Sequence, residues 1–309
     1  MGNGIFYGEW LKCAFLRDTM RKNNGGTDMR IGVSSYSFSQ AIGDGRMTML
    51  DVIPMAKEMG YEGVEIVKTV SDEEMRALAP KLFEQSKEYD MPIIAYMVGA
   101  DFLLKGVDEQ VEELKKEIEI AAILGTRRMR HDATGGKDKD GNEVSWEDAL
   151  PILAEGYFRV TEYAAGIGIK TMIENHGYFA QDAYRVKQLV ETVNHKNFGW
   201  LVDIGNFMCA DETPAESVKI AANYAVHVHA KDFHTKKKGE YVPQFGWFPT
   251  RSGNALRGSL VGHGDVNVPE CLAILKNAGY DGWLSVEFEG IEDCLVALRK
   301  NLEVLRGLV

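Results

Sequence analysis

Residues 169–177 read IKTMIENHG, an apolar run that breaks abruptly into polar residues and a glycine. This pattern is typical of a β-strand whose end carries functional side chains. Two similar runs follow at residues 198–206 (FGWLVDIGN) and 224–232 (YAVHVHAKD), and helical patterns over residues 180–193 and 213–222 separate the three runs. The alternation of strand and helix predicts parallel strands whose carboxyl ends lie on one side of a sheet.

The same rhythm runs from Met29 to the end of the chain. Helix signals support it, because Thr48 and Ser71 are N-cap types, Glu74 stands at the capping-box position after Ser71, and Gly60 closes a helix. Eight strand-then-helix units in a chain of this size predict a (β/α)8 TIM barrel, with an open doubly wound sheet as the alternative. Besides the runs above, we expect strands at residues 30–35, 63–67, 92–97, 127–130 and 283–290, and helices at 48–59, 71–87, 107–124, 145–165 and 291–305.

The composition suits a chain that buries a large core. Of 309 residues, 45% are hydrophobic and 26% charged, and the net charge is -11. Non-specific binding to nucleic acid or to an anionic membrane needs a basic face, so we expect neither partner. No segment fits a signal peptide or a membrane span. The four cysteines, Cys13, Cys209, Cys271 and Cys294, lack metal-site spacing, so we expect a cytoplasmic protein with reduced cysteines.

Two segments depart from the regular pattern. Residues 1–28 form an expected N-terminal extension, because their apolar pieces are short and residues 23–26 (NNGG) resemble a linker to the barrel of residues 29–309. Residues 234–269 form an expected long loop between strands seven and eight, either a substrate lid or a flap packed on the barrel rim. Both segments offer apolar surface, so we expect a homo-oligomer or a complex with a second subunit. The loop carries Tyr241, Phe245, Trp247, Phe248, Arg251 and Arg257.

Four potential metal ligands end the last four strands. Glu174, Asp203 and His229 follow one another at intervals of single βα units, and Glu287 comes after an interval lengthened by the long loop. In a barrel, all four side chains converge on one rim. Three carboxylates and one imidazole form an oxygen-rich site that suits Mn²⁺, with Mg²⁺, Co²⁺ or Zn²⁺ as alternatives.

Strand geometry leaves two of these assignments open, since residues i and i+2 face the same way. His227 is an alternative to His229 as a metal ligand, and Glu289 is an alternative to Glu287. In each pair, the residue that does not bind metal is expected to face substrate. For His227, a position in the hydrophobic core is a further alternative. Lys231 lies on the same face and binds either a substrate carbonyl oxygen or an acidic side chain. His176 and Asn206 follow the ligand positions, where they can donate hydrogen bonds to sugar hydroxyls.

From Met29 onward the chain carries a series of short motifs in a fixed order. They are residues 31–38 (IGVSSYSF), 60–65 (GYEGVE), 173–177 (IENHG), 202–203 (VD), 227–232 (HVHAKD), 262–265 (GHGD) and 279–287 (GYDGWLSVE). In this order they resemble the xylose-isomerase-like TIM-barrel superfamily, also called the sugar phosphate isomerase/epimerase family. In the ketose 3-epimerases and inosose dehydratases of that family, a Glu, an Asp, a His and a Glu on strands five to eight bind one divalent metal. The resemblance assigns these roles to Glu174, Asp203, His229 and Glu287.

Two departures from the family pattern narrow the expectation. The ketose epimerases carry a His three residues after the strand-six Asp, where this chain has Asn206. The DNA-repair branch carries additional His ligands that we do not find, which together with the acidic charge argues against an endonuclease. No glycine-rich phosphate cradle is present either, so the family name is no evidence for a phosphorylated substrate.

The expected reaction is proton abstraction next to the carbonyl of a small sugar or cyclitol, through a metal-stabilised enediolate. Glu174 and Glu287, on opposite sides of the metal, form the expected acid/base pair of an isomerase or epimerase. The alternative is a lyase of the same fold, either an inosose dehydratase or a C-glycoside deglycosidase that acts on 3-oxo-glucosides, in which His131 and Asp132 assist the leaving group instead of capping a loop. A non-enzymatic sugar-binding or scaffold barrel is the third hypothesis.

Overall fold

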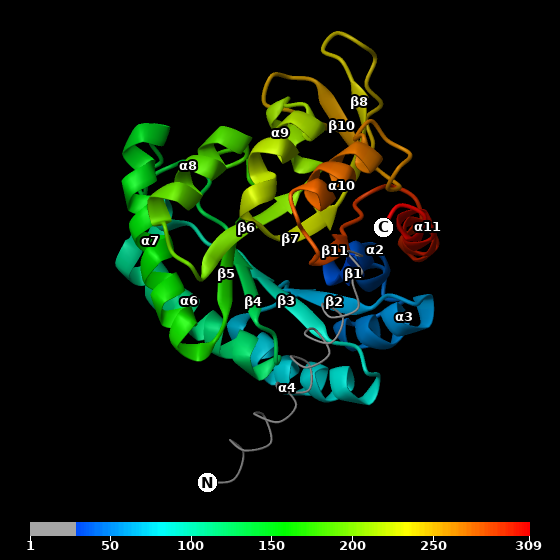
Figure 1. Ribbon diagram of the computed structural model, residues 1–309, viewed down its shortest axis with the longest axis horizontal. Helices are drawn as coiled ribbons and strands as arrows, with labels where there is room; N and C mark the ends of the chain where they lie inside the picture. Colours follow the sequence, from blue (N-terminus) through cyan, green and yellow to red (C-terminus); the bar gives the residue numbers. More distant parts are fainter. Residues whose placement is uncertain (1–28) are drawn as a thin grey trace.

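Eight parallel strands close into a barrel in the computed structural model, which describes residues 29–309 (Figure 1). The order around the barrel is β1-β11-β7-β6-β5-β4-β3-β2, so each strand pairs with its neighbours in the chain and the last strand pairs with the first. The predicted TIM barrel is therefore confirmed, and the open sheet is excluded. The barrel strands are β1 (Arg30–Ser34), β2 (Gly63–Val67), β3 (Ile93–Val98), β4 (Arg128–His131), β5 (Lys170–Glu174), β6 (Phe198–Asp203), β7 (Ala225–Ala230) and β11 (Trp283–Val286).

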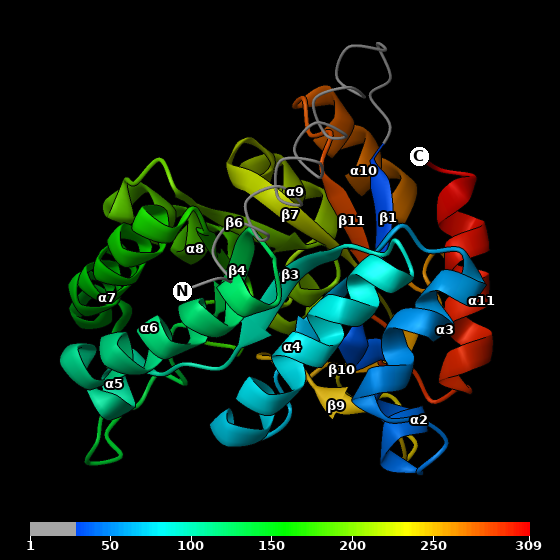
Figure 2. The same ribbon diagram turned by 90° about the horizontal axis from the view of Figure 1, so that it is seen from below.

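The helices surround the barrel (Figures 1 and 2), and some of them begin or end at the residues whose capping signals the sequence shows, whereas the helices expected from residues 48, 180 and 291 begin three or four residues later. Ser71 and Glu74 form a capping box at the start of one helix, and Gly60 ends another in the left-handed conformation with φ of 94°. Thr48 precedes a single 3₁₀ turn and not the α-helix itself. The main helices are α3 (Val52–Met59), α4 (Asp72–Glu88), α6 (Val107–Ile123), α7 (Trp146–Ile167), α8 (Ala183–Val193), α9 (Pro214–Ala221), α10 (Val268–Asn277) and α11 (Cys294–Arg306), with the short α2 (Ser39–Gly43) and α5 (Phe102–Lys105).

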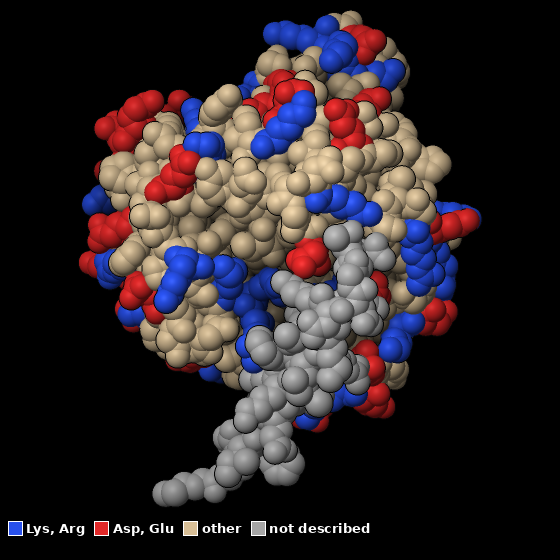
Figure 3. Space-filling model, viewed as in Figure 1, with Lys and Arg blue, Asp and Glu red and all other residues tan. Residues whose placement is uncertain are grey.

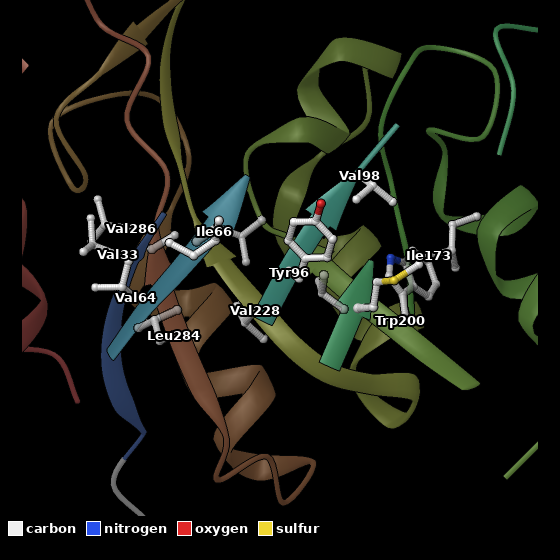
Figure 4. Packing of buried hydrophobic residues seen from close by; sticks show 14 of the residues in the cluster. Val33, Val64, Ile66, Tyr96, Val98, Ile173, Trp200, Val228, Leu284 and Val286 are labelled. Atoms are coloured by element: carbon white, nitrogen blue, oxygen red, sulfur yellow. The ribbon is translucent and has the colours of Figure 1, made fainter. Parts of the chain in front are cut away.

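Alternate residues of each strand face the helices or the barrel interior, as the pleat of a strand requires. Val64 and Ile66 of β2 belong to the large buried layer between the strands and the helices (Figure 4). Glu65, between them, pairs in register with Ala95, which belongs to a separate small cluster. We therefore place Glu65 inside the barrel, together with the other members of that cluster, Met97, Met172 and Leu201.

The long segment between strands seven and eight is not an irregular loop, which corrects the expectation for residues 234–269. It forms a three-stranded antiparallel sheet of β8 (Asp232–Lys236), β10 (Ala255–Ser259) and β9 (Phe248–Pro249). In Figure 2 β9 and β10 lie at the end of the barrel opposite the start of β1, which is the end where the strands finish. Phe233 and Phe248 pack edge to face beneath this sheet, so part of its aromatic content forms a small core of its own.

The carboxylate of Asp232 ties the start of β8 to the segment between β10 and α10. Its two oxygens accept hydrogen bonds from the backbone N–H groups of Phe233, Gly262, Gly264 and Val266, at 2.8 to 3.0 Å. One buried side chain thus satisfies four backbone donors, three of which lie in the segment that has left β10 and not yet entered α10. The GHGD motif of residues 262–265 is the turn that wraps this carboxylate.

Four further expectations concern the N-terminal extension, the cysteines, membrane-spanning helices and the surface charge. The N-terminal extension, residues 1–28, lies outside the described residues. Cys209, Cys271 and Cys294 are free and buried. Within residues 29–309, no helix has the length and apolar character that a bilayer crossing requires. On the face shown in Figure 3, acidic and basic side chains are interspersed, and basic ones gather on the projecting lobe formed by the β8–β10 region.

The anchor at Asp232 predicts that Gly264 cannot carry a side chain. A Cβ at this position would collide with the Asp232 carboxylate and lie 2.5 Å from the carbonyl oxygen of Phe233. We expect Gly264→Ala to lower the free energy of unfolding by about 1–3 kcal/mol, the usual effect of overpacking, measured by chemical denaturation. The matched control is Gly166→Ala, since Gly166 is an exposed residue of α7 with no atom within 4 Å of its added Cβ. That variant should gain about 0.5–1 kcal/mol, and equal stability of the two variants would contradict the proposed anchor.

Candidate metal centre

Four side chains converge at the end of the barrel where the strands finish. One potential ligand atom from each of Glu174, Asp203, His229 and Glu287 lies within 4.8 Å of the other three. Measured from the Nδ1 atom of His229, the carboxylate oxygens lie at 3.3 Å (Glu174), 3.7 Å (Asp203) and 3.5 Å (Glu287). Three of these residues are buried, and Glu287 is partly buried. The structure therefore brings together the four predicted metal ligands from β5, β6, β7 and the end of β11.

Asp203 is held by the backbone around it. Its Oδ1 atom accepts hydrogen bonds from the N–H groups of Gly205 at 2.8 Å and Asn206 at 2.9 Å. The side chain of Asn175 links β5 to β6 beside it, because it accepts from the N–H of Asp203 at 3.0 Å and donates to the carbonyl oxygen of Asp203 at 2.8 Å. The indole N–H of Trp200 donates to the same Asn175 side chain at 3.0 Å. Oδ1 is thus fixed, and Oδ2 is turned toward the centre.

Glu174 contacts a cation on the neighbouring strand. Its Oε2 atom lies 2.7 Å from Arg130 of β4, and Asn206 donates to its Oε1 atom at 3.3 Å. Burial by itself raises the pKa of Glu174, but Arg130 and His229 outweigh this effect and hold the pKa below its ordinary value. Glu174 is therefore ionised at neutral pH, as a metal ligand or a proton acceptor must be.

Glu287 has an equivalent cation in Lys231. The Lys231 ammonium lies 2.5 Å from Glu287 Oε2 and 3.3 Å from Asp203 Oδ2. Burial by itself raises the pKa of Glu287, but Lys231 and His229 outweigh it and hold the pKa well below its ordinary value. Of the two alternatives for Lys231, the structure shows the pairing with acidic side chains.

Two ligand atoms of this cluster satisfy a structural test for a bound cation. Asp203 Oδ2 and His229 Nδ1 are buried, and neither makes a hydrogen bond of good geometry to any described residue. Their charged neighbours are Lys231, 3.3 Å from Oδ2, and the carboxylates 3.3 to 3.7 Å from Nδ1. Buried polar atoms usually make a hydrogen bond, so two that lack one at the same place call for an explanation. Both atoms point at the same small volume, together with oxygens of Glu174 and Glu287. One imidazole nitrogen and three carboxylate oxygens fit a first-row divalent ion or Mg²⁺.

His176 and Asp132 lie at the rim above Arg130. Asp132 Oδ1 is 2.8 Å from the Arg130 guanidinium and 2.9 Å from Nδ1 of His176, whose side chain is exposed. Burial raises the pKa of Asp132, but Arg130 and His176 outweigh it and lower the pKa to about 2. Asp132 is therefore ionised, and its pairing with His176 leaves the other side of that imidazole ring open to solvent or substrate.

Two predicted site residues do not reach this mouth. His131 is fully buried, stacks on Tyr157 of α7 with ring centroids 4.2 Å apart and contacts Phe102. Because it is the outward-facing neighbour of Arg130, it lies between barrel and helices, where burial lowers its pKa to about 4. The acid/base role expected for His131 therefore does not fit its position. His227 is also fully buried and lies one layer deeper than His229, so it does not face substrate.

Three residues of the site were missed as functional residues in the sequence. Arg130 lies on the inward face of β4, two positions before Asp132. The alternation of Arg128 with Arg130 could have indicated that these arginines share the face of Asp132. Asn175 is part of the quoted IENHG motif, but its role as a clamp depends on β6. Glu65 ends the quoted GYEGVE motif, and it binds the two histidines of β7 from across the barrel.

The sheet of β8, β10 and β9, called the lid sheet for its place beside the mouth and not for a shown function, is bound to the neighbouring loops. The hydroxyl of Tyr178, after β5, donates to the carbonyl oxygen of Pro249 at 2.7 Å, and Arg251 pairs with Asp182 at 3.0 Å. After β11, Gly290 forms a bridge with Gly258 of β10. The sheet is therefore held on two sides of the opening.

Asn206 lies between Glu174 and Lys231, with its side-chain oxygen 3.2 Å from the Lys231 ammonium.

Comparison with known proteins identifies relatives at two levels of coverage. An uncharacterised protein of Methanocaldococcus jannaschii is 26% identical over 300 residues, which cover 91% of this chain and 92% of the relative. An inosose dehydratase of Clostridium perfringens is 28% identical over 151 residues, or 48% of this chain and 50% of the relative. The match to the dehydratase thus spans about half of each chain.

Solved structures show the same fold, and some of them contain a metal. The crystal structure of the IolI protein with a bound zinc atom has a TM-score of 0.72 and 18% identity, and the similarity covers 91% of this chain and 99% of that one. At this identity the likeness shows the fold alone. The sequence also matches the family described as xylose isomerase-like TIM barrel over residues 53–308. With its closed barrel and its cluster of ligands at the strand ends, the chain belongs to the xylose isomerase-like TIM barrel family.

Proposed function

We propose that this protein is a divalent-metal-dependent isomerase or epimerase that moves a proton next to the carbonyl of a sugar or cyclitol. The observation that carries the proposal is the paired arrangement of Glu174 and Glu287 at one centre, each bound by its own cation. An epimerase that removes a proton from one face of a carbon and returns one to the other face uses two such groups, one on each side of the substrate.

Mn²⁺ is the proposed ion, with Mg²⁺, Co²⁺ and Zn²⁺ as alternatives, because carboxylate oxygens outnumber nitrogen three to one in the ligand set. When bound, the ion would polarise a carbonyl and an adjacent hydroxyl group and so make the neighbouring C–H bond more acidic. Glu174, Asp203, His229 and Glu287 would hold it. A solved structure of similar fold that contains a bound zinc atom supports a divalent ion as a ligand of this fold.

The residues of the chain define the proton path. Glu174 and Glu287 are ionised, so either one can accept the α-proton of a substrate bound between them, while the other, once protonated, can return a proton. Arg130 and Lys231 hold the two carboxylate groups in place through contacts at 2.7 and 2.5 Å. Positioned groups of this kind contribute about 10²–10⁴-fold to a rate.

The polar groups around the centre suit a polyhydroxylated substrate. Arg130 and Lys231 are bound to carboxylates, and the carboxylates of Asp132 and Glu289 lie nearby at the rim. Sugar hydroxyls can donate hydrogen bonds to these oxygens. Asn206 and His176 offer further hydrogen-bonding groups for the same substrate.

A lyase reaction is the second candidate, supported by the pair of His176 and Asp132. The pair lies at the rim, 2.9 Å apart, and its imidazole is exposed. This imidazole can give a proton to a leaving hydroxyl or glycosyl oxygen after the α-proton has been removed. The partial similarity to an inosose dehydratase favours the same outcome, and a bulkier substrate such as a 3-oxo-glucoside belongs to this candidate.

Assembly is a separate proposal that rests on the lid sheet. Tyr241 and Phe245 are 83% and 76% exposed on the segment between β8 and β9. Two large apolar side chains so close together would gain free energy by packing on a second copy of the chain or on a second subunit. Light scattering of the purified protein checks this, and a monomer with no co-purifying partner would contradict it.

The ligand set predicts that one divalent ion binds per chain and that Asp203→Asn weakens its binding. Asparagine preserves the oxygen that accepts from Gly205 and Asn206 but removes the charge on the atom aimed at the centre. Loss of an outer-shell partner lowers metal affinity by about 10–100-fold. Because Asp203 is itself a proposed ligand, we expect a larger fall in the affinity for Mn²⁺. Calorimetric titration of the metal-stripped protein measures this change.

Elemental analysis of the loaded protein provides the stoichiometry. Asp211→Asn is the control, because Asp211 is an acidic residue that binds Thr250, Ser252 and Asn254 in the lid, away from the cluster. A wild-type protein that retains no stoichiometric metal, or an Asp203→Asn variant with unchanged affinity, would contradict the metal centre.

The glutamate pair predicts that Glu174→Gln and Glu287→Gln each lower turnover by about 10²–10⁴-fold. A substrate is first found by screening keto-sugars, inososes and 3-oxo-glucosides with Mn²⁺. Conversion in deuterated buffer should then place solvent deuterium in the product or in recovered substrate, since proton transfer passes through the two carboxylates. Conversion without deuterium incorporation would indicate a hydride shift and contradict the proposed step.

The variant His176→Asn distinguishes the two candidate reactions. If the protein is an epimerase, this change mainly weakens substrate binding, and no group leaves the substrate. If it is a lyase, loss of the imidazole lowers the rate of leaving-group departure, while exchange of the α-proton with deuterated solvent continues. Nuclear magnetic resonance of the reaction mixture follows both events at once. Unchanged kinetics for this variant would remove the support for the lyase.

A further inference from the structure

A fully buried glutamate inside the barrel contacts the imidazole that faces the candidate metal centre. One carboxylate oxygen of Glu65, Oε2, lies 3.0 Å from Nε2 of His229, and the other, Oε1, contacts Nε2 of His227. All three residues are at most 1% exposed. No part of the mechanism above uses Glu65 or His227.

The sequence places these groups face to face through strand geometry. His227 and His229 are two residues apart on β7, so both point into the barrel. Leu201 of the interior cluster pairs in register with His227, and Asp203 of the candidate centre pairs with His229. His227 is therefore the deeper of the two. Glu65 reaches both from β2, on the far side of β1 and β11 in the order of the barrel.

The contact with Glu65 determines which nitrogen of His229 faces the ligands. A carboxylate oxygen accepts hydrogen bonds, so the Nε2 atom that faces it carries a hydrogen. The opposite nitrogen, Nδ1, is then the atom directed toward Glu174, Asp203 and Glu287, and it makes no hydrogen bond to any residue of the described chain. An imidazole that binds a metal through one nitrogen typically donates from the other to a carboxylate in this way.

His227 holds Glu65 in place. It occupies the second carboxylate oxygen, and its Nε2 atom is also 3.3 Å from the hydroxyl of Ser285 on β11. With one imidazole on each oxygen, the carboxylate of Glu65 cannot rotate away from His229 without losing a buried hydrogen bond. The three side chains thus form a fixed chain from the barrel interior to the centre.

A second metal ion between these three residues is the competing explanation, because their ligand atoms also lie within 4.8 Å of one another. Direct hydrogen bonds account for these atoms without an ion, because Nε2 of each histidine contacts its own oxygen of Glu65. The number of ions bound per chain decides between the two explanations.

We propose that Glu65 is a positioning residue that fixes the tautomer and orientation of His229, so that Nδ1 is the atom presented to the metal. The proposal rests on the metal centre of the proposed function and extends it to the barrel interior. Glu65 has no contact with substrate in this role. Its effect appears in metal affinity and in the protonation pattern of His229.

The variant Glu65→Gln tests this role, because the amide offers only one acceptor oxygen to two imidazoles. The other imidazole then faces an NH₂ group and must turn over or change tautomer. We expect the affinity for Mn²⁺ to fall by about 10–100-fold, as for other outer-shell partners, while one ion per chain still binds at saturation. Competition with a chelator in the absence of substrate measures the affinity directly.

The matched control is Glu117→Gln. Glu117 is also a buried glutamate, held by Tyr96 at 2.7 Å and Lys68 at 2.5 Å, but it belongs to α6 outside the barrel. This variant should lose stability without losing metal affinity. Equal metal affinity for wild type and Glu65→Gln overturns the positioning role, and two ions per wild-type chain overturn it in favour of a second metal site.

A measurement on the wild-type protein keeps the test valid if Glu65→Gln does not fold. Nitrogen-15 spectra of labelled histidines in the Zn²⁺-loaded protein should show His229 with hydrogen on Nε2 and none on Nδ1, and the hydrogen should persist in slow exchange. Hydrogen on Nδ1 with metal at Nε2 overturns the proposal. Absence of any bound metal instead contradicts the proposed function itself, so the two failures are distinguishable.

Discussion

Mutual repulsion among carboxylates in a partly dehydrated barrel mouth is the constraint on which the rest of the structure depends. Glu174, Asp203 and Glu287 share a volume in which water solvates them poorly, and such charges are costly unless they are paired. Arg130 and Lys231 each supply one positive charge at hydrogen-bonding distance. Backbone N–H groups offset the charge of Asp203. The cluster still keeps two buried ligand atoms without a hydrogen bond, which is the arrangement expected of a site built for a cation.

The barrel makes this concentration of charge sustainable because each carboxylate comes from a different strand. Each strand end brings its own supporting group, such as Asn175 between β5 and β6 or Lys231 just after β7. Below the mouth, Glu65 and His227 continue the polar chain into an interior otherwise filled by Ala95, Met97, Met172 and Leu201. Buried networks of this kind are stable only when their members are satisfied, so the network restricts how each ligand can move.

One short segment connects the chemistry to the lid. In residues 229–232, His229 points into the centre, Lys231 contacts two of its carboxylates, and Asp232 turns the other way to bind the backbone of residues 262–266. The alternation of a strand thus places a candidate ligand and the anchor of the lid sheet within four residues.

The sequence by itself determined the barrel, because eight repeats of strand and helix with ordinary capping signals are local patterns that do not depend on distant contacts. It also determined which residues end the strands, and parallel topology then brought Glu174, Asp203, His229 and Glu287 to one rim. Tertiary structure decided which way each side chain points and what it meets. On β4, Arg130 points into the barrel and His131 points outward to Tyr157. The sequence of this four-residue strand does not show which residues face inward, because polar residues occupy both faces. The contact of Glu65 with His227 and His229 joins residues more than 160 positions apart, and the sheet of β8–β10 depends on pairings between short, polar strands. Such contacts arise only when the barrel closes, because closure alone fixes the distances between strands that are not neighbours.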